Sequence, residues 1–168
     1  MAGVLALLVM GCALTEAFTP KPDGDLPEEK APPVETSDGG VVESSAKVEV
    51  FKNTNDGAVR NGPTEQVEFT LDAATRITYI QTYHWNNGAG VAPGTIGLKK
   101  ADGTVVGTWD AKGEPGQGGV ANAYWAVEPD VVLEPGTYVV VDSDPKTQST
   151  NEQMAGRGQT VIQGILEQ

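Results

Sequence analysis

The residues that most restrict the fold of this chain are those that alternate between apolar and polar along short segments. In residues 66–71, Val67, Phe69 and Leu71 alternate with polar side chains, which is the period of a strand with one face on a core and the other in water. No long stretch carries apolar residues at helical spacing, and 21 glycines and 11 prolines among 168 residues supply frequent turns. The chain is therefore expected to be all-β.

A longer alternating segment, residues 76–85, follows. In uninterrupted alternation, Ile77 and Tyr83 lie on one face, and Ile80 and His84 lie on the other. Because both faces then carry apolar or aromatic groups, this segment is expected to be a central strand of a sheet.

Turn-forming residues predict how the remaining strands connect. Asp102-Gly103 joins residues 95–100 to residues 104–109 in a predicted hairpin. Glu134-Pro135-Gly136 similarly predicts a hairpin between residues 131–133 and 137–141. Further strands are expected over residues 47–51, 124–127 and 159–165. About eight short strands with turns between them favour a jelly-roll-like antiparallel β-sandwich over a barrel.

The first residues have the pattern of a secretion signal. Residues 4–10 form an apolar run too short to span a bilayer. The sequence Val9-Met10-Gly11-Cys12 resembles the bacterial lipobox, whose cysteine is lipidated after cleavage. We therefore expect a lipoprotein signal peptide over residues 1–11 and a lipid anchor on Cys12, the chain's single cysteine. The protein would be extracytoplasmic, anchored in the bacterial cell envelope at the outer membrane or cell surface. The alternatives are a simple cleaved signal and a buried N-terminal strand.

Residues 12–46 are expected to form a disordered tether, and residues 47–168 the β-sandwich domain. From residue 15 to residue 45 the chain is rich in Pro, Gly, Ser and acidic residues, which bury too little apolar surface to offset the entropy of ordering. The whole chain has a net charge of −12, which opposes binding to nucleic acid.

Residues at the end of the predicted central strand form a candidate ligand site. Three segments could converge there: residues 82–88, 116–125 and 141–145. Broad aromatic rings with polar edges suit sugar rings or peptide prolines, and the alternative is that these rings fill the core. The candidate ligand-binding residues are Tyr83, His84, Trp85, Asn86, Asn87, Tyr124 and Trp125.

His84 is the only histidine. Catalysis would need a partner nucleophile, and the chain has neither a nucleophile-elbow motif nor a His/Cys cluster. No catalytic residue is therefore assigned, and a hydrolase that uses His84 with Asp142 or Asp144 is kept as an alternative.

Asp142 and Asp144 follow a predicted strand and could place two carboxylates on one side. With Asn151 and backbone carbonyls they could bind calcium, which prefers oxygen ligands. The alternative is an Asx turn, in which the carboxylates accept backbone N–H bonds.

Several short motifs resemble known secreted domains. Residues 133–140, LEPGTYVV, look like the hairpin near the end of bacterial pre-peptidase C-terminal domains. The motifs TYHWN (82–86), GQGGV (116–120), NAYW (122–125) and DSDP (142–145) resemble an uncharacterised family of secreted bacterial β-sandwich domains over residues 48–165. This resemblance implies an extracytoplasmic module and supplies no catalytic residues.

The sequence thus predicts a lipid-anchored binding or adhesion module that contacts a cell-surface glycan or a protein and catalyses no reaction. The alternatives are a structural subunit that assembles with itself or with an envelope partner through its sheet edges, and the hydrolase described above.

Overall fold

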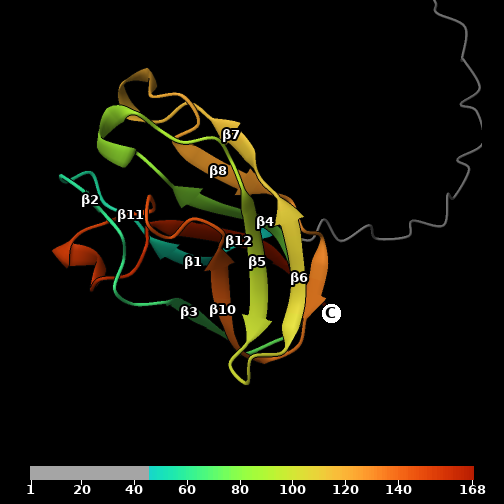
Figure 1. Cartoon of the computed structure of the whole chain (residues 1–168). Coiled ribbons are helices and arrows are strands. Elements are labelled where there is room, and N and C mark those ends of the chain that lie inside the picture. Colours follow the sequence, from blue (N-terminus) through green and yellow to red (C-terminus); the bar gives the residue numbers. More distant parts are fainter. Residues whose placement is uncertain (1–45) are drawn as a thin grey trace, which may run out of the picture. The chain divides into compact units, whose positions relative to one another are not determined.

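The computed structural model describes residues 46–168 (Figure 1), so the predictions for the signal, Cys12 and residues 12–45 of the tether lie outside the described residues. This part of the chain contains three short 3₁₀ helices and no helix long and apolar enough to cross a membrane. Eight of its strands have four or more residues: β1 (Lys47–Asn53), β3 (Val67–Leu71), β4 (Thr75–Tyr83), β5 (Thr95–Lys100), β6 (Val105–Asp110), β8 (Tyr124–Val127), β10 (Gly136–Asp142) and β12 (Thr160–Leu166). The shorter elements are β2 (Arg60–Asn61), η1 (Asn86–Gly88), β7 (Lys112–Glu114), η2 (Gln117–Gly119), β9 (Val131–Leu133), β11 (Ser149–Thr150) and η3 (Glu152–Met154).

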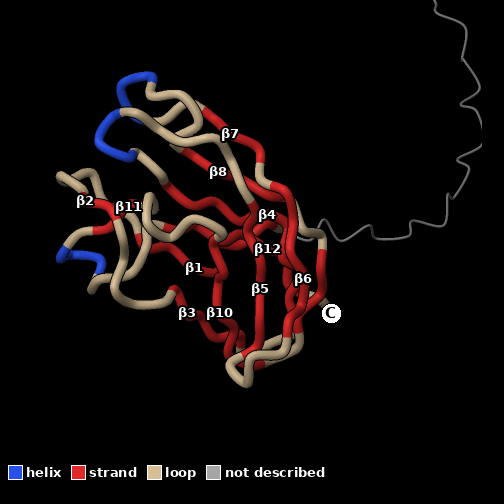
Figure 2. The backbone as a smooth tube through the Cα atoms, viewed as in Figure 1, coloured by secondary structure: helices blue, strands red, loops and turns tan. Residues whose placement is uncertain are grey.

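The strands form two facing antiparallel sheets, which confirms the predicted β-sandwich (Figure 1; Figure 2). One sheet has the order β1-β12-β4-β8-β7, and β9 also pairs with β4. The other has the order β3-β10-β5-β6, and β2 and β11 form a separate small ribbon. Because the chain passes repeatedly from one sheet to the other, the arrangement is that of a jelly roll.

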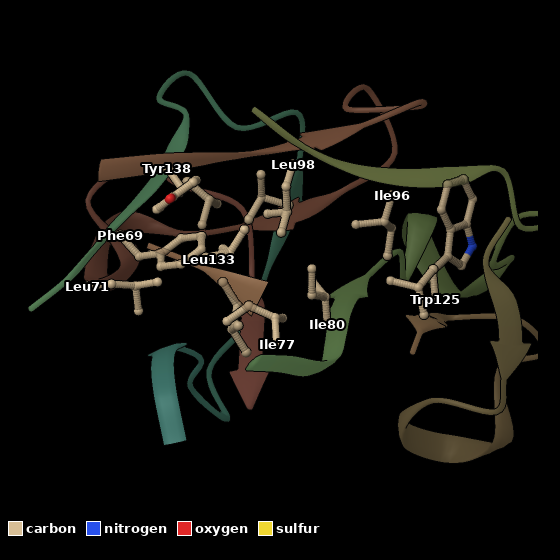
Figure 3. Packing of buried hydrophobic residues seen from close by; sticks show 13 residues of the cluster. Phe69, Leu71, Ile77, Ile80, Ile96, Leu98, Trp125, Leu133 and Tyr138 are labelled. Atoms are coloured by element: carbon tan, nitrogen blue, oxygen red, sulfur yellow. The ribbon is translucent and has the colours of Figure 1, made fainter. Parts of the chain in front are cut away.

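The hydrophobic core lies between the two sheets (Figure 3). Val67, Phe69 and Leu71 of β3 are all buried, while the polar residues between them are exposed. These side chains meet Ile77 and Ile80 of the facing sheet in one continuous cluster. The alternation of residues 67–71 therefore predicted the buried face of this strand correctly.

Strand β4 is central, as predicted, but the expected faces of its residues are wrong at one end. Its pairing with β12 shifts register, so that Tyr79 faces Gln163 whereas Ile77 faces Gly164. Thr78 is the extra residue of a β-bulge, which reverses the alternation of the strand. As a result Ile77 and Ile80 both point into the core, each with 0% exposure, and not to opposite faces.

The predicted hairpin at Asp102-Gly103 is confirmed, because β5 and β6 are antiparallel neighbours. The hairpin predicted at Glu134-Pro135-Gly136 is wrong. β9 pairs with β4 in one sheet, whereas β10 pairs with β3 and β5 in the other. These turn residues therefore carry the chain between the sheets, and the hydroxyl of Tyr138 secures them by donating to the carbonyl of Glu134 over 2.8 Å.

Candidate ligand-binding site

The three segments singled out in the sequence meet at one end of the domain. β4 and β8 are antiparallel neighbours, with Tyr83 opposite Tyr124 and Thr82 opposite Trp125. The end of β10 reaches the same place from the other sheet, because Asp142 contacts His84, the residue that follows β4. Figure 2 shows η1 and η2 together at this end of the domain, away from the β5–β6 turn. The predicted convergence is therefore present.

The aromatic residues of this end divide between two environments. Tyr83 and Tyr124 contact each other with ring centroids 4.7 Å apart. Trp125 turns inward, where it is 1% exposed and belongs to the core cluster. Its indole N–H donates to the carbonyl of Val91 over 3.2 Å. Trp125, one of the predicted ligand-binding residues, is therefore a core residue.

His84 is fully buried, and both ring nitrogens lie within hydrogen-bonding distance of protein oxygens. Nε2 lies 3.0 Å from Oδ2 of Asp142 and 3.1 Å from Oγ1 of Thr82. Nδ1 lies 2.9 Å from Oγ1 of Thr147. The ring stacks on Trp125, with centroids 3.8 Å apart and planes 18° from parallel. His84 therefore links the end of β4 to the end of β10 across the sandwich.

The carboxylates considered for calcium bind groups of the protein itself. Oδ1 of Asp142 accepts the backbone N–H of Asp144 over 2.8 Å, which is the Asx turn of the alternative interpretation. Oδ2 of Asp144 accepts the hydroxyl of Thr147 over 3.0 Å. Asn151 exchanges side-chain hydrogen bonds with Asn55 instead.

No group of three or more His, Cys, Asp or Glu residues within residues 46–168 is arranged to hold a metal ion. Calcium also binds backbone carbonyls, amide oxygens and water, so calcium binding stays a prediction.

A cavity of about 260 Å³ lies beside the end of β4. Two of the predicted ligand-binding residues, Tyr83 and Trp85, form part of its wall. The others are placed differently: Asn86 is held by hydrogen bonds with Asn61 and Gly90, and Asn87 is exposed. The described residues that line the cavity are Asn55, Asp56, Gly57, Ala58, Val59, Tyr83, Trp85, Gln117 and Gln159.

Local conformation explains how Trp85 and Tyr83 reach this wall. Trp85 begins the η1 turn, in which Asn87 has a φ of 56°, a left-handed conformation that Asn tolerates. Gly116 lies so close to Tyr83 that a β-carbon there would be 2.9 Å from Cε2 of the ring. A glycine is therefore needed for the loop before β8 to cover the tyrosine.

The phenol of Tyr83 stays neutral at physiological pH. Burial is the main cause that raises its pKa above the ordinary value, and the neighbouring Tyr124 raises it further. The backbone N–H of Gln117 opposes this shift by bonding to the phenol oxygen. Tyr83 therefore presents a neutral ring to the cavity.

The most informative wall residue was not predicted from the sequence. Gln159 comes just before β12 and is 7% exposed. Its Oε1 is the one buried side-chain nitrogen or oxygen in residues 46–168 that has no hydrogen-bond partner. No local motif marks it, since its position depends on where the last strand enters the sheet. No local motif marked the loop that contains Asn55 and Val59 as part of the site either.

Comparison of the chain with protein-family models, curated proteins and solved structures found no match. The resemblance to secreted β-sandwich domains accordingly rests on the motifs quoted above.

Proposed function

We propose that the protein is a lipid-anchored, extracytoplasmic β-sandwich that acts as a non-catalytic binding module. The observation that carries this proposal is the cavity at the end of β4, walled by Tyr83 and Trp85. Concave sites with aromatic walls and a few convergent polar groups are the usual form of ligand sites.

The surroundings of His84 favour binding over hydrolysis. A histidine that acts as a general base needs a ring nitrogen within reach of the substrate proton. The ring of His84 has 0% exposure, and its nitrogens face Asp142, Thr82 and Thr147. The pair His84–Asp142 of the hydrolase alternative exists, but as a buried connection between the sheets.

Replacing Trp85 with alanine tests the binding role. We expect the whole chain to bind at least one member of a glycan array or of a random-peptide phage library. Trp85→Ala should weaken that binding roughly 30-fold or more, as for a central aromatic contact. The matched control is Trp109→Ala, because Trp109 is a partly buried tryptophan that lines a separate hollow with Tyr79 and Glu128.

Far-ultraviolet circular dichroism and thermal melting of both variants would show that their folds are retained. A chain that binds nothing in either collection, or a ligand whose affinity is unchanged by Trp85→Ala, would refute the binding role at this cavity.

The anchor is tested separately at Cys12. In a bacterial host, the wild-type protein should sediment with membranes and yield an N-terminal peptide whose mass includes acyl chains. Cys12→Ser removes the thiol that would carry the lipid, so this variant should lose both properties. Equal membrane association of the two proteins, with no acyl mass on the wild type, would contradict lipidation.

A further inference from the structure

Gln159, a residue of the cavity wall, has a buried amide oxygen that no group in residues 46–168 uses as an acceptor. Its side chain is more than nine-tenths buried and lines the cavity, and Oε1 has no partner among the described residues. A buried acceptor without a partner destabilises a fold. The terminal torsion of a glutamine is broad and two-fold, so the amide can turn toward a donor in the cavity.

The remaining walls disfavour anionic ligands. Asp56 is the one charged residue among those lining the cavity, and it is exposed at the rim. Together with the net charge of −12, it disfavours carboxylate, sulfate and phosphate ligands. Asn55 and Gln117 add amides, while Tyr83 and Trp85 add aromatic rings. Among uncharged ligands, these walls suit one with several hydroxyl groups and an apolar face.

The size of the cavity suits one ring of a ligand. Its volume of about 260 Å³ is below the roughly 300–1,000 Å³ of clefts that take drug-sized molecules. Tyr83 and Gln159 are buried, whereas Asp56, Gly57, Ala58 and Gln117 are exposed. This arrangement gives the cavity a closed floor and an open rim, so that the rest of a longer ligand can extend out of it.

We infer that the cavity binds a single neutral sugar ring of a glycan. The apolar face of the ring lies on Trp85, and a ring hydroxyl donates to Oε1 of Gln159. This inference rests on the proposed binding function and names its ligand class. It also gives Gln159 a role, because the bound hydroxyl supplies the missing partner.

Replacing Gln159 with methionine separates this role from a purely structural one. Methionine has a similar length and fills irregular space without a strong acceptor. Removing the unpaired amide oxygen should raise Tm by about 3–6 °C, while sugar affinity should fall about tenfold or more. The matched control is Gln163→Met, since Gln163 lies in β12, the strand that Gln159 precedes, opposite Tyr79 and outside the cavity wall. This control should leave the affinity unchanged.

The measurement is an NMR titration of the whole chain with methyl glycosides of glucose, galactose, mannose and N-acetylglucosamine. Saturable shifts of the Trp85 indole and of residues 55–59, lost in Gln159→Met and kept in Gln163→Met, would support the inference. Glucuronic acid is the charged control and should bind at least tenfold more weakly than the best neutral glycoside.

Three results would overturn the sugar assignment: no shifts with any glycoside, equal binding of glucuronic acid, or an affinity that Gln159→Met leaves unchanged. If peptides selected from the phage library bind in a Trp85-dependent way while no sugar does, the sugar class is wrong and the binding function stands. If neither class of ligand binds, both proposals fail.

Discussion

His84→Ala is expected to lower the free energy of unfolding by about 3–5 kcal/mol. The substitution removes a ring that stacks on Trp125 and leaves space in a fully buried position. It also removes one of the two hydrogen-bond partners that Oδ2 of Asp142 has within residues 46–168. Water cannot easily replace this partner, because the side chain of Asp142 is only 4% exposed. A buried carboxylate that loses a partner is costly. Urea denaturation monitored by tryptophan fluorescence measures the change.

Gln81→Ala is the matched control for this experiment. Gln81 belongs to β4, the strand that His84 follows, is partly exposed, and its side chain donates to the hydroxyl of Tyr79. Its replacement should cost about 1 kcal/mol at most. If His84→Ala cost no more than Gln81→Ala, His84 would not be the connection between sheets described above.

Gly90→Ala is expected to cost about 2–5 kcal/mol and to weaken ligand binding as well. A β-carbon on Gly90 would overlap the carbonyl oxygen of Ala121, and the residue has a φ of 61°, where L side chains are strained. The N–H of Gly90 donates to the carbonyl of Trp85 over 3.1 Å, and its own carbonyl accepts from Asn86. A shift of Gly90 would therefore move the loop that positions Trp85.

Gly103→Ala is the control that separates the cost of the overlap with Ala121 from the cost of a positive φ. Gly103 also has a positive φ, 91°, but a β-carbon there would meet no atom within 4 Å. Its replacement should cost only about 1–2 kcal/mol of backbone strain, and ligand binding should not change. Equal unfolding free energies of the two variants would show that the contact between Gly90 and Ala121 does not restrict the loop.

Patterns within a few residues predicted much of the fold and part of the candidate site. Asp102-Gly103 predicted its hairpin because the conformation of a tight turn depends on the turn residues themselves. The same kind of evidence failed at Glu134-Pro135-Gly136, where turn residues indicate that the chain bends but not which sheet the next strand joins. Tyr83 and Trp85, which were both predicted as ligand-binding residues, line one cavity.

The sequence by itself determined that residues 47–168 form short strands separated by turns, since alternation and turn chemistry are local properties. Tertiary structure alone decided that Thr78 is a bulge, that Asp142 and Thr147 bind His84, and that Gln159 lines a cavity with Trp85. The physical reason is that each of these features depends on register and packing between strands distant in the chain. Such contacts are fixed by burying the whole core at once, and no short segment encodes them.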